Sequence, residues 1–133
     1  KQQKKENNLE LYINQFTPLN KDGNGNLMMF ENSTVKSPEI SLKRGKYELV
    51  INGNSLQGKP IQGKNAHLLI KINEQEIANY YLSENLNNRE KKLSFEWTSD
   101  KKARISLIFD NDISVNGLDR NVVVYSIKIK ELK

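Results

Sequence analysis

The fold class is decided by the stretch Ala103-Arg104-Ile105-Ser106-Leu107-Ile108-Phe109. In an extended chain, Ile105, Leu107 and Phe109 fall on one face, whereas Arg104 and Ser106 fall on the other. Side chains of a β-strand alternate between two faces, so this pattern predicts a strand with one apolar face and one polar face.

The same period of two recurs along the chain. It predicts further strands over residues 9–13, 46–52, 66–73 and 122–132. Loops rich in Asn, Gly and Ser lie between them, at residues 22–26, 52–65, 84–89 and 111–119. Residues 73–82 are compatible with either a short helical turn or a hairpin. Many short strands without a sustained helical stripe predict an all-β, two-sheet β-sandwich.

Length and composition set the number of domains and exclude several classes of functional site. A chain of 133 residues matches one domain, and we expect a polar tail or linker at residues 1–8 followed by a single sandwich at 9–133. Because there is no cysteine, disulfides, thiolate metal sites and cysteine nucleophiles are excluded. His67 is the single histidine, which excludes a histidine-rich zinc site. No apolar stretch approaches the roughly 18 residues that a membrane span needs.

The net charge of +5 raises the question of nucleic-acid binding. Apart from the first five residues, however, the lysines are scattered, and there is neither a basic helix nor an RNA-recognition signature. Dispersed lysines are typical of a solvated surface, so we predict no nucleic-acid partner. No signal peptide is visible, so we expect either an intracellular protein or one whose leader has been removed.

One connection between two apolar strands concentrates oxygen-bearing side chains. Residues 109–121 contain three aspartates and three asparagines. Calcium takes roughly 6–8 oxygen ligands from carboxylates, amides and carbonyls. If the loop doubles back, it brings Asp112 and Asp119 together, with the carbonyl of Gly117 or Leu118 between them. An Asx-rich turn bonded to its own backbone is the alternative, and composition leaves both open.

A second Asp-rich segment is a weaker calcium candidate. Residues 22–26, Asp-Gly-Asn-Gly-Asn, begin like a helix–loop–helix calcium loop. That pattern requires glycine at its sixth position and glutamate at its twelfth, where this chain has Leu27 and Ser33. The segment therefore predicts a turn.

The aromatic residues offer candidate surfaces for sugar stacking. One member of the pair Tyr80-Tyr81 must point outward from a strand, and an exposed ring can stack on the apolar face of a sugar. Trp97 alternates with Phe95, so we expect both in the core. His67 is expected to be an outward-facing strand residue.

Two stretches carry a resemblance to a known family. Gly45-Lys46-Tyr47-Glu48-Leu49 resembles the "GxYxL" strand of galactose-binding-like β-sandwiches. Phe109-Asp110-Asn111-Asp112, followed by Asp119-Arg120-Asn121-Val122, resembles the "FxND…DRN-hydrophobic" signature of calcium-dependent carbohydrate-binding modules. The most similar of these are the small xylan-binding modules of families 36 and 60, and the similarity runs from about residue 9 to residue 132.

The resemblance implies a jelly-roll sandwich without catalytic activity, in which one bound calcium contacts sugar hydroxyls directly. Carried onto this sequence, Asp112 and Asp119 hold the ion and Leu118 adds its backbone carbonyl. Asp110 is a further candidate ligand of the metal, and Asn111 is a candidate contact for the sugar. Arg120 is expected to brace the loop by pairing with a carboxylate.

The chain departs from the family at two positions. Ile113-Ser114 stands where related modules often carry an aromatic residue, which removes a stacking platform and weakens the case for xylan. Tyr125 stands where some relatives have an acid for a second calcium, so we predict no second ion.

The leading prediction is a non-catalytic, calcium-dependent module that binds a polysaccharide, xylan-like or another β-glycan. We expect it to be secreted or displayed on a bacterial surface, as part of a larger enzyme or lipoprotein. The alternative is a structural or protein-interaction sandwich, such as an adhesin or assembly domain, with at most a structural calcium. A small enzyme has less support, because one histidine and no recognisable nucleophile leave little catalytic machinery.

Overall fold

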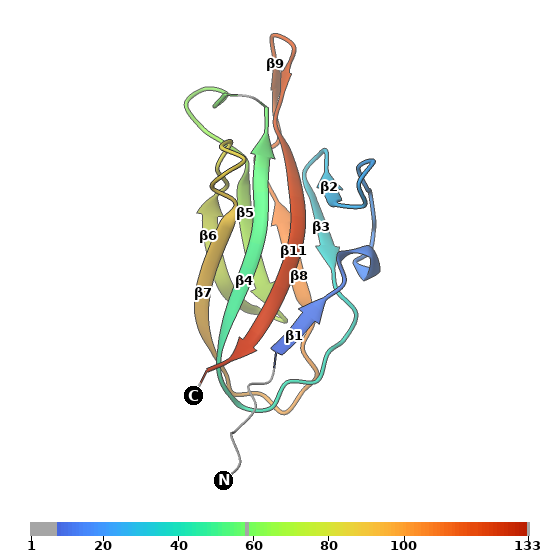
Figure 1. Ribbon diagram of the computed structural model, residues 1–133, viewed down its shortest axis with the longest axis vertical. Helices are drawn as coiled ribbons and strands as arrows, with labels where there is room; N and C mark the ends of the chain where they lie inside the picture. Colours follow the sequence, from blue (N-terminus) through green and yellow to red (C-terminus); the bar gives the residue numbers. More distant parts are fainter. Residues whose placement is uncertain (1–7, 58, 133) are drawn as a thin grey trace.

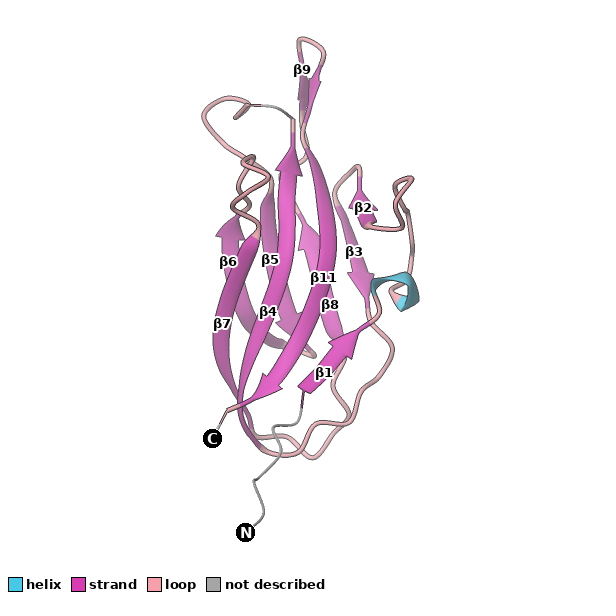
Figure 2. Cartoon of the chain, in the orientation of Figure 1, coloured by secondary structure: helices cyan, strands magenta, loops and turns pink. Residues whose placement is uncertain are grey.

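Two antiparallel sheets pack face to face in the computed structural model, which describes residues 8–57 and 59–132 (Figures 1 and 2). The first sheet has the order β1 (Asn8–Leu11), β11 (Asn121–Glu131), β4 (Gly45–Leu56) and β7 (Glu90–Trp97), and β2 (Leu27–Met29) also pairs with β11. The second has the order β3 (Ser33–Lys36), β8 (Ile105–Phe109), β5 (His67–Ile72) and β6 (Gln75–Tyr81). A separate hairpin joins β9 (Ser114–Val115) to β10 (Leu118–Asp119), and one 3-10 turn spans Ile13–Gln15. The all-β, jelly-roll sandwich predicted from the sequence is confirmed.

The apolar faces of the two sheets meet in one core. On β8, Ile105, Leu107 and Phe109 are at most 1% exposed, as the alternation predicted. They belong to the same buried cluster as apolar residues of β4, β5 and β11. Burial of each such side chain stabilises the fold by roughly 1.5–3 kcal/mol. Trp97 and Phe95 also lie in this core, as expected.

Strand β4 continues through Asn52-Gly53, where the sequence predicted its end, and that prediction is wrong. Gly53 pairs with Val124 of β11, and a Cβ atom at Gly53 would lie only 2.8 Å from the carbonyl oxygen of Val123. The next residue, Asn54, is fully buried and donates from its side chain to the carbonyl of Ser83. Asn52 and Gly53 are typical of a turn, but here the close approach of β11 requires a glycine within the strand. The polar side chain of Asn54 can be buried because it has a hydrogen-bond partner.

Replacement of Gly53 by Ala is expected to lower the free energy of unfolding by about 1–3 kcal/mol, a typical range for overpacking. The added methyl group would collide with a backbone oxygen of the β4–β11 ladder, which cannot move without shifting the strand. Gly23→Ala is the matched control, because a Cβ atom there meets nothing within 4 Å. Urea unfolding should show a change of less than about 0.5 kcal/mol for the control. Equal effects of the two substitutions would contradict the close approach.

Other predicted boundaries shift locally. The predicted strand 9–13 ends at Leu11 and gives way to the 3-10 turn. Residues 73–82 form a hairpin rather than a helical turn, with Asn73 at φ 52° between β5 and β6. Of the predicted tail at residues 1–8, residues 1–7 lie outside the described residues. The backbone of Asn8 already belongs to β1. In the part of the chain that is described, no helix has the length and hydrophobicity to cross a membrane.

Candidate metal and ligand site

The acidic connection folds into a tight hairpin that projects from one end of the sandwich (Figure 1). Leu118 pairs with Val115, and Asp119 pairs with Ser114. Between the paired residues, Asn116 (φ 51°) and Gly117 (φ 79°) are both left-handed. Asn-Gly in this conformation is the favoured two-residue hairpin turn. The connection therefore doubles back, as the calcium hypothesis required.

The register of the hairpin gathers oxygen-bearing side chains on one face. The backbone N–H of Arg120 donates to the carbonyl of Ile113 at 3.0 Å, which extends the ladder one step beyond β9 and β10. Because side chains alternate along an extended chain, Asp119 and Asn121 share one face and Arg120 faces the other way.

The negative charge of Asp119 acts on Asp112. Burial raises the pKa of the Asp112 carboxyl above its ordinary value of 3.8, and the negative charges of Asp119 and Glu31 raise it further. The N–H of Ile113 and the charge of Arg120 oppose this shift only in part. A carboxylate in such surroundings is disfavoured in its ionised form until a proton or a cation joins it.

Two oxygen atoms at this site are buried without a hydrogen-bond partner among the described residues. They are Oδ1 of Asp112 and Oδ1 of Asn121. Buried acceptors without a partner are rare and unfavourable, so these two oxygens are free to accept from a donor or to bind a cation. The donor set, two carboxylates and an amide oxygen, fits the preference of calcium for oxygen ligands.

The protein oxygens do not complete a coordination shell. In residues 8–57 and 59–132, no group of three or more His, Asp or Glu side chains is placed to hold a metal ion. A calcium at Asp112 and Asp119 would therefore need amide or backbone oxygens, together with water or ligand. The backbone around Asp112 is held in place, because its N–H donates to Oδ1 of Asn32 at 2.7 Å.

Asp110 and Asn111 have other partners. The carboxylate of Asp110 contacts Nδ1 of His67 at 2.8 Å. The side chain of Asn111 accepts from the N–H of His67 at 2.8 Å and donates to the carbonyl of Asn65 at 2.9 Å. These contacts brace the loop against β5. The metal role of Asp110 and the sugar role of Asn111 therefore remain predictions without support from the geometry.

Leu118 also has a partner inside the hairpin. In a two-residue hairpin, the residues that close the turn exchange both backbone hydrogen bonds, and here these residues are Val115 and Leu118. The Leu118 carbonyl is therefore engaged with Val115, and its role as a calcium ligand remains a prediction.

Arg120 braces the loop, but through backbone carbonyls rather than the carboxylate that we expected. Its side chain is only 4% exposed. The guanidinium donates to the carbonyl of Asn111, to that of Ile61 at 2.7 Å and to that of Lys64 at 3.1 Å. One buried cation thus joins the acidic loop to the loop between β4 and β5, and holds the base of the hairpin in a defined position.

The tyrosine pair divides as the strand alternation predicts. Tyr81 is 54% exposed, and its ring lies 5.0 Å from that of His67. Tyr80 packs partly against the core, where burial raises its pKa. Only Tyr81 therefore offers an open ring face. The Tyr81 ring lies beside His67, which in turn contacts Asp110.

The loop at residues 22–26 is satisfied by its own atoms. Oδ1 of Asp22 accepts from the N–H groups of Asn24 at 2.8 Å and Asn26 at 2.9 Å. The side chain of Asn26 also donates to Asp22, and this bond is the main cause that lowers the pKa of Asp22. The turn predicted from the sequence is confirmed.

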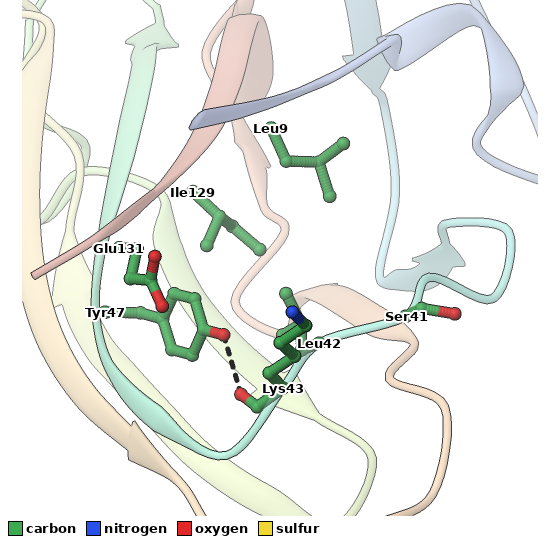
Figure 3. Close-up of a pocket in the computed structure, with 7 residues that line it drawn as sticks. All are labelled: Leu9, Ser41, Leu42, Lys43, Tyr47, Ile129 and Glu131. Carbon is green, nitrogen blue, oxygen red and sulfur yellow. Dashed lines mark hydrogen bonds between the residues drawn. The ribbon is translucent and has the colours of Figure 1, made fainter. Parts of the chain in front are cut away.

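A pocket of about 200 Å³ lies at the other end of the sandwich, where β1 begins and β11 ends (Figures 1 and 3). Leu9, Ile129 and the ring of Tyr47 line it, and the Tyr47 hydroxyl donates to the carbonyl of Lys43 at 2.6 Å. No residue of the acidic hairpin lines this pocket.

Comparisons with known proteins agree with this architecture. No protein-family model and no curated protein sequence matches the chain. Among solved structures, the C-terminal CBM6 (family 6 carbohydrate-binding module) of a marine laminarinase from Zobellia galactanivorans matches with a TM-score of 0.61. That match has 11% identity and covers 94% of this chain and 100% of the other.

Two further structures belong to family 36. The CBM36-1 domain of a multidomain xylanase from the hindgut metagenome of Trinervitermes trinervoides has a TM-score of 0.59 and 13% identity, and the match covers 97% and 99% of the two chains. A CBM36 in complex with calcium and xylotriose has a TM-score of 0.59 and 11% identity, and the match covers 92% and 98%. Over almost its whole described length, this chain therefore has the β-sandwich fold of carbohydrate-binding modules, and CBM36 is among the structures that share it.

Proposed function

We propose that this chain is a non-catalytic carbohydrate-binding module that binds a polysaccharide, xylan-like or another β-glycan, through a calcium ion held by Asp112 and Asp119. The observation that carries the proposal is the buried, unpaired oxygen of Asp112 beside a second carboxylate. The fold likeness to a module named as a complex with calcium and xylotriose supports it.

Three side chains would bind the ion, and two others would hold the loop in place. Asp112 and Asp119 would offset the charge of the ion, and Asn121 would add an amide oxygen from the same face as Asp119. When bound, calcium supplies open coordination positions that neighbouring hydroxyls of a sugar can fill. Arg120 and Asn32 hold the loop in place, so little ordering is needed on binding. A requirement for two suitably placed hydroxyls selects among sugars by stereochemistry.

The surroundings of His67 support a binding role rather than catalysis. Its two ring nitrogens contact the side chains of Asp110 and Asn79. Neither partner is a hydroxyl nucleophile, as a hydrolase built on His67 would need.

We also propose that the module works outside the cell as part of a larger protein. Attachment to that protein would raise the effective concentration of a weak binding site.

Calorimetry with plant and microbial glycans, with calcium and with EDTA, tests this proposal. We expect heat of binding for at least one β-glycan in calcium and none in EDTA, because the ion itself contacts the sugar. Binding that persists unchanged in EDTA would show that the calcium mechanism is wrong. If calcium binds and raises the melting temperature but no glycan binds, the chain is instead a structural sandwich with a structural ion.

A further inference from the structure

A groove of about 390 Å³ runs across the outer face of the second sheet, away from the acidic hairpin. Its walls come from β3, β5, the start of β8 and the turn between β5 and β6. The volume is within the range of small-ligand sites, roughly 300–1,000 Å³. None of Asp112, Asp119 and Asn121 lines it.

Three cationic side chains line this groove. Lys36 of β3 pairs with Ser106 of β8, and Ser106 pairs with Lys71 of β5, so the two lysines stand in one row across three strands. Two strand spacings separate them by about 10 Å. Arg104 lies two residues before Ser106 and faces the same side, where Asn73 fixes its backbone through a 2.8 Å hydrogen bond.

The positive charges are only partly offset by the protein, because Glu74 lines the groove and Glu76 of β6 pairs in register with Lys71. Within the described residues, Lys36, Lys71 and Arg104 form no ion pair. Glu74 is the one carboxylate that lines the groove, which leaves a formal net charge of +2 from three cations and one anion. Like charges in one groove repel each other, so an anion between them is favoured.

The floor of the groove carries one hydroxyl group. Ser106 pairs with both Lys36 and Lys71, and it lines the groove although the residue is only 8% exposed. Its hydroxyl makes no hydrogen bond with the described residues, and its oxygen reaches solvent rather than being buried. The Ser106 hydroxyl can therefore donate to a ligand that enters between the lysines.

We propose that this groove binds a carboxylate group of an acidic polysaccharide through Lys36, Lys71, Arg104 and Ser106. The proposal rests on the proposed function, because it defines a class of glycan for the same module at a second site. A carboxylate accepts several hydrogen bonds at once and matches the planar fork of an arginine. Two lysines and a hydroxyl at the floor complete the set of donors.

The geometry favours an acidic glycan over a nucleic acid. A nucleic acid site needs many phosphate contacts, and a single-stranded site adds aromatic platforms for the bases. The groove has three cations opposed by Glu74, and no aromatic side chain lines it. Ile108 offers an apolar surface beside the cations, against which the C–H face of a sugar ring can pack.

The test uses the whole chain in EDTA, so that the calcium site is silent. Three soluble β-glucans with the same backbone serve as probes: carboxymethyl cellulose, neutral hydroxyethyl cellulose and cellulose sulfate. Affinity electrophoresis should show retardation by carboxymethyl cellulose and none by the neutral polymer. Replacement of Lys71 and Arg104 by Gln should weaken binding roughly tenfold or more, since it removes two positive charges that donate to the carboxylate.

Matched variants separate a site from general attraction. Lys46→Gln with Lys128→Gln removes two exposed charges from the other sheet and should leave binding unchanged. Ser106→Ala leaves the charge intact and should still weaken binding severalfold. The proposal is overturned if the control pair has the same effect as the groove pair, if Ser106→Ala binds normally, or if cellulose sulfate or duplex DNA binds more tightly. Because calcium is absent throughout, failure here would leave the calcium-dependent site unaffected.

Discussion

Replacement of Asp112 by Asn is expected to abolish calcium-dependent glycan binding and to weaken calcium binding at least about 100-fold. Even changes in the outer shell of a metal site weaken binding roughly 10–100-fold, and Asp112 is the central predicted ligand. Its carboxylate is also the group whose buried oxygen has no partner among the described residues. Calorimetric titration with calcium, followed by titration with the best β-glycan, measures both effects.

Asp100→Asn is the matched control, because that exposed carboxylate is paired with Arg44 at 2.7 Å and lies in another loop. It should bind calcium and glycan like the unaltered chain. Asp110→Asn tests the further ligand predicted from sequence. Because Asp110 already contacts His67, this variant should lose much less calcium affinity than the Asp112 variant. Normal calcium affinity in the Asp112 variant would remove the basis of the proposed function.

The Asp112 variant should also change how stability depends on pH in EDTA. The pKa of Asp112 is raised in the folded chain above the ordinary value of 3.8, so between the two pKa values the folded state holds more protons than the unfolded state. The free energy of unfolding therefore falls as the pH rises from about 3.8 through the folded-state pKa. Asp112→Asn should reduce this fall and should be at least as stable as the original at neutral pH. A loss of stability in EDTA would contradict the electrostatic argument.

Replacement of Arg120 by Met is expected to lower the free energy of unfolding by about 3 kcal/mol and to abolish calcium binding. The substitution leaves the buried carbonyls of Asn111, Ile61 and Lys64 without their donor, and each such loss costs about 1–3 kcal/mol, offset in part by removal of a buried charge. The loops released by this change include the segment that positions Asp112. Urea unfolding and calcium titration measure the two effects.

Arg44→Met is the control for this substitution, because its ion pair with Asp100 is solvent-exposed. Such pairs contribute roughly 0–1 kcal/mol, and the calcium affinity should not change. Arg120→Lys should recover only part of the stability, since an ammonium group cannot reproduce the fork that reaches separate carbonyls. An Arg120→Met variant as stable as the original would show that the three hydrogen bonds contribute little.

Much of the fold could be predicted because alternation is a local property. Ile105, Leu107 and Phe109 identify the apolar face of β8 within five residues of sequence, and the structure buries all three. The continuation of β4 could not be predicted in the same way. Asn52-Gly53 is a turn signal by itself, and its place in a strand depends on the approach of Val123 from β11.

The candidate site shows the same division. Asp112 and Asp119 were selected from composition and family resemblance, and the chain between them doubles back as that prediction required. Asn121 was missed, although alternation from Asp119 already places it on the same face. The Asn116-Gly117 pair was a local signal for the turn that sets this register.

Local sequence patterns identified β1, β4, β5, β8 and β11, and they located the connection where the acidic side chains gather. Long-range packing decides the rest: Arg120 joins two loops, Gly53 must lack a side chain, and Ser106 stands between two lysines from different strands. The two kinds of feature differ in how far apart along the chain the interacting residues lie. Alternation and turn preference arise from neighbouring residues, whereas hydrogen-bond partners, close approaches and grooves are made by strands far apart in the chain, whose pairing no local pattern specifies.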